Sequence, residues 1–100
     1  MKDKLLTIAS VKGVSPDEDD SGAMPAFVVK GAWRGVPFEY EVAVELDGRE
    51  AEWDHKSGAD PRDPDDADFD AFLDEEAAIY DAVWSSAAMT AARARYDAAG

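Results

Sequence analysis

Residues 37–46 read PFEYEVAVEL, and apolar and other side chains alternate through this stretch without interruption. Successive side chains of a β-strand point to opposite faces of the sheet, so the alternation predicts a strand with one buried and one solvated face. The predicted buried face consists of Phe38, Tyr40, Val42, Val44 and Leu46. The opposite face carries Glu39, Glu41, Ala43 and Glu45, with neighbours on it roughly 6.5–7 Å apart. The strand therefore presents a row of carboxylates on a rigid support.

Two further strands are expected before this one. Residues 4–14 predict a first strand with an irregularity near Ser10, and residues 26–33 predict a second strand in which Gly31 marks a bulge. The Arg34-Gly35 pair predicts a tight turn into the alternating strand. These signals are typical of an antiparallel meander, in which neighbours in sequence are neighbours in the sheet.

A fourth strand is expected on the other side of the alternating stretch. The Asp47-Gly48 pair is a strong hairpin signal, and residues 49–53 predict a short strand after it. This strand would bring Glu50 and Glu52 beside the glutamate row. The strands together cover about residues 4–54, and a linker is expected over residues 55–63.

The remainder of the chain predicts helix. Asp63 and Pro64 resemble a helix start, with Asp as the N-cap and Pro at the first helical position, and helix formers continue to about Ala98. Ser85-Ser86 allows a break, so one long helix and two shorter ones are both consistent with the pattern. The apolar stripe expected at helical spacing consists of Phe69, Phe72, Leu73, Tyr80, Val83, Trp84, Ala87 and Ala91. Glu76 falls inside this stripe, and the pattern offers no reason for it.

These patterns predict one α+β domain over residues 1–100. A three- or four-stranded antiparallel β-meander is followed by a C-terminal helical segment, over about residues 64–98, that is packed on one face of the sheet. One hundred residues suit a single domain with a small core.

Composition limits the classes of function. The chain has 23 acidic and 10 basic residues, which gives a formal charge of −13. Such a charge argues against direct binding to nucleic acid or to an anionic membrane, and it favours a partner with a basic surface, or cations. There is no Cys, hence no disulfide framework, thiolate metal site or cysteine nucleophile. No signal-peptide pattern or long apolar run is present, so a cytoplasmic protein is expected.

Two sets of carboxylates are candidate partner-binding residues. The strands supply Glu39, Glu41, Glu45, Glu50 and Glu52, and the helical segment supplies Asp70, Asp74 and Asp81 in a narrow arc away from the apolar stripe. Carboxylates fixed on sheet and helix would imitate the phosphate rows that basic grooves hold, and they are good bidentate partners for Arg. The alternative is that these acids are solvated faces of a chain with a general bias toward Asp, which also has no Asn and no Gln.

Calcium binding is a weaker possibility. Residues 17–22 begin like an EF-hand loop with Asp17, Asp19, Ser21 and Gly22, but Val28 stands where a bidentate Glu is required. Asp66, Asp68 and Asp70 also alternate, with Ala71 and Ala77 replacing the turn glycine and the final acid. A solvated turn and a capped helix start explain these stretches better, so neither a metal nor another cofactor is expected.

Enzyme chemistry has little support in the sequence. His55 is the only histidine, and it falls in the expected linker. No nucleophile elbow or phosphate-binding glycine loop is present. We therefore expect a protein without catalytic residues.

The stretches EYEVAVE (residues 39–45) and DPDDADFDAFLDEE (residues 63–76) give the chain a resemblance to the small acidic inhibitors that phages make against host defence. These include anti-CRISPR proteins that imitate DNA, and the similarity lies in size, charge and layout. The resemblance implies a non-enzymatic monomer or homodimer that binds the Lys/Arg-lined groove of a nucleic-acid-binding complex. One alternative is a small phage or bacterial structural or assembly protein that self-associates through its Ala-rich helix, and a second is a calcium-binding module.

Overall fold

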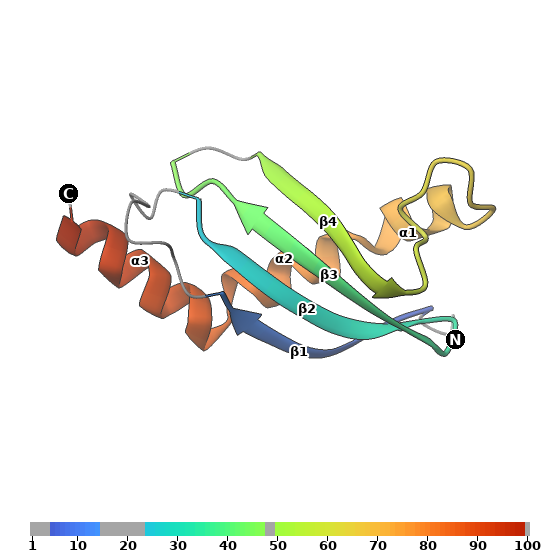
Figure 1. The fold of residues 1–100 in the computed structure, drawn as a ribbon, viewed down its shortest axis with the longest axis horizontal. Helices are drawn as coiled ribbons and strands as arrows, with labels where there is room; N and C mark the ends of the chain where they lie inside the picture. The colour runs from blue at the N-terminus through green and yellow to red at the C-terminus, as the bar shows by residue number, and fades with distance from the viewer. Residues whose placement is uncertain (1–4, 15–23, 48–49, 100) are drawn as a thin grey trace.

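The computed structural model describes residues 5–14, 24–47 and 50–99, and it confirms the α+β architecture. The elements in chain order are β1 (Leu6–Gly13), β2 (Ala26–Trp33), β3 (Val36–Val44), β4 (Ala51–Gly58), α1 (Phe69–Glu75), α2 (Ala77–Trp84) and α3 (Ala87–Ala99). The four strands form one antiparallel sheet in the order β1-β2-β3-β4. The helices follow one another along one side of the sheet, and α3 runs past its end (Figure 1).

The hairpin between β2 and β3 turns at Arg34 and Gly35, as the sequence predicts. Both residues have positive φ values, 51° and 83°, which is the geometry of a two-residue type I′ turn. The expected irregularity near Ser10 is also confirmed, because the register of β1 shifts between Ile8 and Ser10. The bulge therefore belongs to β1, whereas β2 runs through Gly31 in unbroken register with β3. A Cβ atom at Gly31 would lie 2.2 Å from the Thr7 carbonyl oxygen, so the bulge requires glycine opposite it.

The prediction of a linker from residue 55 is wrong, because β4 continues to Gly58. His55 pairs with Tyr40, and a register shift between Glu39 and Tyr40 leaves Lys56 as an extra residue in β4. A polar sequence can continue as a strand here because β4 is an edge strand with only one face turned toward the core. At its own end, β3 stops at Val44 rather than at Leu46.

The helical segment starts later than predicted and has three helices. Helix α1 begins at Phe69 rather than at residue 64. The side chains of Asp63 and Asp66 accept the backbone N–H groups of Asp65 and Asp68, at 2.9 and 2.8 Å. Such local bonds offer the backbone an alternative to helix, so residues 61–68 form successive turns.

Two breaks separate the helices. Of the two alternatives that Ser85-Ser86 allows, the structure has the break, and the Ser86 hydroxyl accepts the Met89 backbone N–H at 3.1 Å, as in an N-cap. A second break falls at Glu76, between α1 and α2. Phe72, Ile79 and Val83 keep helical spacing across the break at Glu76, whereas Met89 and Ala92 lie out of phase with them after Ser85-Ser86, so a single continuous stripe is only partly correct.

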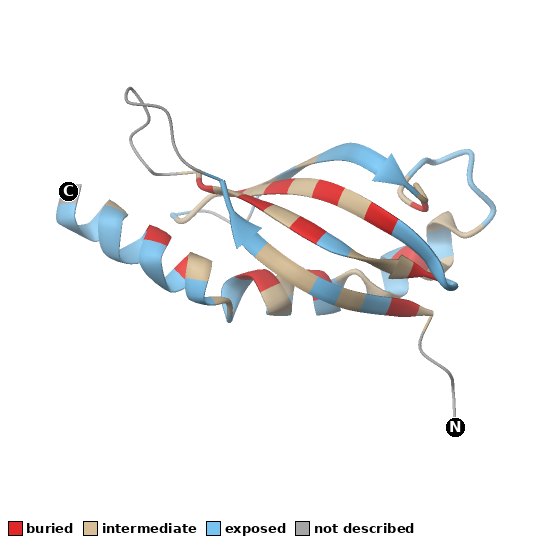
Figure 2. Ribbon diagram, turned by 60° about the horizontal axis from the view of Figure 1, so that its bottom comes forward, coloured by how far each residue is buried: buried red, intermediate tan, exposed pale blue. Residues whose placement is uncertain are grey.

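The core lies between the inward face of the sheet and the helices, and buried positions alternate with less buried ones along β2 and β3 (Figure 2). The core residues are Leu6, Phe27, Val29, Trp33, Phe38, Tyr40, Val42, Val44, Phe72, Ile79, Val83, Met89 and Ala92. The predicted stripe is correct at Phe72 and Val83. It is wrong at Leu73, Trp84, Ala87 and Ala91, which are exposed, and it omitted Ile79, Met89 and Ala92.

Phe72 is the centre of an aromatic cluster. Its ring centroid lies 5.3 Å from that of Trp33, 6.3 Å from that of Tyr40 and 6.4 Å from that of Trp53. The neighbouring Leu73 points outward and is 43% exposed. The contrast between buried Phe72 and exposed Leu73 therefore shows which side of α1 faces the core.

Phe72→Ala should lower the free energy of unfolding by about 3–5 kcal/mol, because it removes a ring from a closely packed core. Leu73→Ala is the matched control and should cost less than about 1 kcal/mol. Urea unfolding followed by tryptophan fluorescence measures both. Equal costs for the two variants would show that α1 is rotated relative to this arrangement.

Candidate functional site

The outward face of the sheet holds three of the predicted acids. Glu39 and Glu41 lie on β3 and Glu52 lies on β4, and all three alternate with residues that face the core. Asp54, which the sequence prediction left out, stands directly opposite Glu41 across the two strands. The longer β4 places it there, so an interpretation that ended the strand at Trp53 could not include it.

Lysines interrupt this acidic face. Lys30 Nζ lies 3.5 Å from Glu39 Oε1, and Lys56 Nζ lies 2.7 Å from Asp54 Oδ2. The pKa of Lys56 is raised, first by its hydrogen bond to Asp54 and also by the fields of Glu41 and Glu39. The outward face is therefore a surface of both signs rather than a continuous row of carboxylates.

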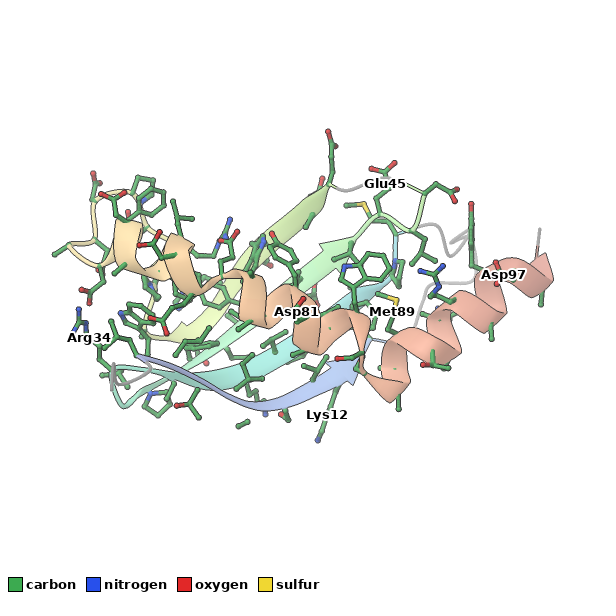
Figure 3. The ribbon with its side chains drawn as sticks, turned by 180° about the vertical axis from the view of Figure 1, so that it is seen from behind. Lys12, Arg34, Glu45, Asp81, Met89 and Asp97 are labelled. Carbon is green, nitrogen blue, oxygen red and sulfur yellow. The ribbon has the colours of Figure 1, made fainter. Side chains whose placement is uncertain are left out.

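Glu45 and Glu50 lie just beyond the ends of their strands. Because β3 stops at Val44, Glu45 belongs to the connection that follows, and its backbone N–H donates to the Glu50 carbonyl oxygen at 3.0 Å. Glu50 directly precedes β4 and is exposed. Figure 3 shows Glu45 at the end of the sheet nearer α3, and the backbone bond between them places Glu50 beside it.

The helical acids lie on the other side of the molecule. Asp70 and Asp74 are on α1 and Asp81 is on α2, and all three are exposed. In Figure 3 Asp81 is seen on the helical layer, which covers the inward face of the sheet. The eight predicted residues therefore do not form one surface, because the strand set and the helix set face in opposite directions.

Residues 60–76 contain nine acids and one base. Five of these acids are exposed and make no ion pair with another described side chain: Asp63, Asp65, Asp66, Asp70 and Asp74. We call this set the acidic end. It lies at the end of the sheet that carries the Arg34-Gly35 turn (Figure 1).

The basic side chains near the acidic end are already paired. Arg34 Nε donates to Asp68 Oδ2 at 2.9 Å, and Trp33 Nε1 donates to the same oxygen at 3.0 Å. These two bonds, that from Arg34 first, lower the pKa of Asp68. Arg62 pairs with Glu76, so neither arginine neutralises the five exposed carboxylates.

A polar and aromatic cluster fastens the acidic segment to the sheet. The Tyr40 hydroxyl donates to Asp60 Oδ1 at 2.8 Å, and the Arg62 guanidinium lies 4.0 Å from the centre of the Trp53 ring. Arg62 also explains Glu76, since it supplies the partner that lets a carboxylate occupy the apolar face of the helices. Asp60 and Arg62 thus attach the connection between β4 and α1 to the sheet, and Arg62 also attaches it to Glu76 between α1 and α2.

Tyr80 and His55 complete this cluster. Trp53 Nε1 donates to the Tyr80 hydroxyl at 2.8 Å, which joins β4 to α2. His55 Nε2 lies 3.1 Å from the Gly58 carbonyl oxygen, and Nδ1 lies 4.0 Å from Asp60 Oδ2. The single histidine therefore lies within β4 rather than in a linker.

The two calcium candidates have different outcomes. Residues 17–22 lie outside the described residues. Asp66, Asp68 and Asp70 do not converge, because Asp66 accepts a backbone N–H and Asp68 is held by Trp33 and Arg34. Within residues 5–14, 24–47 and 50–99, no group of three or more His, Cys, Asp or Glu side chains is placed to hold a metal ion.

Within the same described residues, no helix is long and apolar enough to span a membrane.

Comparisons with protein-family models, with curated proteins and with solved structures gave no match.

Tyr40→Phe should cost about 1 kcal/mol at pH 7, because it removes the hydroxyl that donates to Asp60. Burial, followed by the bond to Asp60, raises the pKa of Tyr40 above its ordinary value of 10.0. A group with a raised pKa in the folded state stabilises the fold below its unfolded pKa and loses this contribution as the pH rises. The difference in the free energy of unfolding between the wild type and Tyr40→Phe should therefore shrink above pH 10.

Urea unfolding at pH steps from neutral to alkaline measures this difference. Other titrating groups are common to both chains, so the difference isolates Tyr40. A difference that grows as the pH rises would contradict the assigned bond.

Proposed function

We propose that the protein is a non-enzymatic inhibitor that presents a DNA-like acidic surface to the basic nucleic-acid-binding groove of a bacterial defence complex of the CRISPR effector type. The observation that supports this proposal is the acidic end, where five exposed carboxylates lie beside arginines that are already paired. A groove lined with Lys and Arg would supply positive counter-charges for these carboxylates.

The electrostatics of the acidic end suit recognition of such a groove. The exposed carboxylates repel one another, and a basic partner relieves this repulsion on binding. Charge complementarity of this kind speeds association, and salt weakens it because exposed charges are screened within about 10 Å at 0.1 M ionic strength. Binding should therefore be fast, salt-sensitive and competitive with DNA.

The acidic end is also preorganised. Asp60, Arg62 and Asp68 each contact a side chain of the sheet, and the turns between them are closed by Asp63 and Asp66. A surface that is ordered before binding loses less conformational entropy when the partner docks. This distinguishes the segment from a solvated acidic tail.

Reversal of four acids at the acidic end, Asp63, Asp65, Asp70 and Asp74 to Lys, should weaken binding to a purified CRISPR effector by about 30- to 1,000-fold. This range assumes about 0.5–1 kcal/mol for each lost ion pair. Biolayer interferometry at low and high salt, with and without competing DNA, measures the change.

The matched control is reversal of three acids on the outward sheet face, Glu39, Glu41 and Glu52 to Lys. This variant should retain most of the affinity if the acidic end is the contact surface. Loss of binding in the control alone would move the site to the sheet, and effectors that fail to bind the wild type in any salt would overturn the proposed function.

A second candidate function is that of a small assembly protein that self-associates through α3. It is favoured by the exposure of Ala87, Ala91, Ala94 and Ala98, whose spacing of four, three and four residues follows one side of a helix. Ala91→Glu combined with Ala94→Glu should abolish oligomers formed in this way, as seen in the sedimentation coefficient. An unchanged oligomeric state would exclude α3 as the interface.

A further inference from the structure

The outward face of the sheet is divided by charge along the line between β2 and β3. Lys12 and Lys30 project from β1 and β2, whereas Glu39, Glu41, Glu52 and Asp54 project from β3 and β4. Lys56, the extra residue of β4, is the exception on the acidic half. No described helix covers this face, because the helices pack on the opposite one (Figure 1).

Charges on this face are incompletely satisfied within one chain. Glu41 stands directly opposite Asp54, and like charges at this position in an antiparallel pair destabilise it. Lys12 lies in the same row, two strands away from Glu41, and forms no ion pair with any of the described residues. Lys56 supplies one cation to this pair through Asp54, and Glu41 has no ion pair of its own with the described residues. A binding partner that adds a second cation beside Glu41 and Asp54 and an anion over Lys12 would resolve both.

We propose that the partner of this face is a second copy of the chain, related by a two-fold axis parallel to the strands. This rotation exchanges β1 with β4 and β2 with β3 and keeps each row of the sheet at the same height. The partner's Lys12 then lies over Asp54 beside Glu41, and the partner's Lys30 lies over Glu39. The symmetry repeats both contacts, which gives four ion pairs between the two copies.

The division of charge selects this occupant over others. A uniformly basic partner would be repelled by Lys12, Lys30 and Lys56, and a uniformly acidic partner would be repelled by the four carboxylates. A surface with one sign on each half is complementary to itself after a two-fold rotation, and wrong partners are rejected by like charges. Beside the charged side chains, the face carries the small apolar side chains of Ala26, Val28, Ala32 and Ala43, which allow close approach.

The size of the face predicts a weak dimer. Four strands spaced about 4.8 Å apart and eight residues long give a footprint of roughly 500 Å² per copy. Two copies would bury roughly 1,000 Å², which is at the lower limit of specific interfaces, so dissociation constants in the micromolar range are expected.

The axis also has a consequence for the acidic end. A rotation about an axis parallel to the strands leaves both acidic ends at the same end of the dimer. This consequence, unlike the dimer itself, rests on the proposed function, in which it would double the surface offered to a basic groove.

Complementary charge variants test the dimer. Lys12→Glu with Lys30→Glu makes the face wholly acidic on both halves apart from Lys56, and Glu39→Lys with Asp54→Lys gives lysines opposite lysines. Each variant should be monomeric at concentrations at which the wild type dimerises, and an equimolar mixture should form a heterodimer. Because their formal charges become −17 and −9, both remain acidic, and nonspecific attraction cannot explain association.

Sedimentation velocity from about 1 to 300 µM, without any other partner, measures all four samples around the micromolar range expected for this area. The control is a mixture of the acidic variant with Asp70→Lys, Asp74→Lys, which carries the same −9 charge on the helical side and should not form a heterodimer. The single swaps Lys12→Glu and Asp54→Lys repeat the test if a double variant fails to fold.

Three results would overturn the proposal: a wild type that stays monomeric, face variants that dimerise as the wild type does, or an equimolar mixture of the two variants that forms no heterodimer. Dimerisation that is lost only in the Ala91→Glu, Ala94→Glu variant would assign the interface to α3 instead. None of these results bears on binding to a CRISPR effector, so the dimer and the proposed function are tested separately.

Discussion

Burial of one side of β3 against the helices is the constraint on which the rest of the structure depends. Phe38, Tyr40, Val42 and Val44 all face inward, where they meet Phe72, Ile79 and Val83. Because side chains alternate with a period of two, a slip of one residue would bury the glutamates and expose the aromatic and aliphatic set. The inward face therefore fixes the outward face as well, and with it the positions of Glu39 and Glu41 relative to their neighbours on β2 and β4.

Local patterns in the sequence predicted the elements whose signals are local. The alternation of β3 and the Arg34-Gly35 turn depend on a few adjacent residues, and both are confirmed, whereas Ser85-Ser86 only allowed the break that the structure has. The extent of β4 could not be predicted, because Asp54 to Gly58 become strand through pairing with β3 rather than through their own propensity. The late start of α1 has a similar cause, since the Asp63 and Asp66 side chains bind nearby N–H groups in turns.

The candidate site could be predicted by residue type but not by arrangement. Which acids are near lysines, and which arginines are already paired, depends on contacts between segments far apart in the chain. Arg34 with Asp68 and Arg62 with Glu76 are such contacts, and they leave the acidic end without counter-charges. On the outward sheet face, by contrast, Lys30 pairs with Glu39 and Lys56 pairs with Asp54, so the carboxylates there have counter-charges. The acidic end and the outward sheet face are thus two surfaces with different properties, the first negative and the second of both signs.

The most direct test of this division is an amide NMR titration with a short arginine-rich peptide, carried out at low and at high salt. Shift changes should concentrate in residues 60–76, be small for the outward-facing residues of β3 and β4, and disappear at high salt. Shift changes that are largest in β3 and β4, or that spread evenly over the exposed acids, would contradict this division. The latter result would mean that the negative charge forms no defined binding surface.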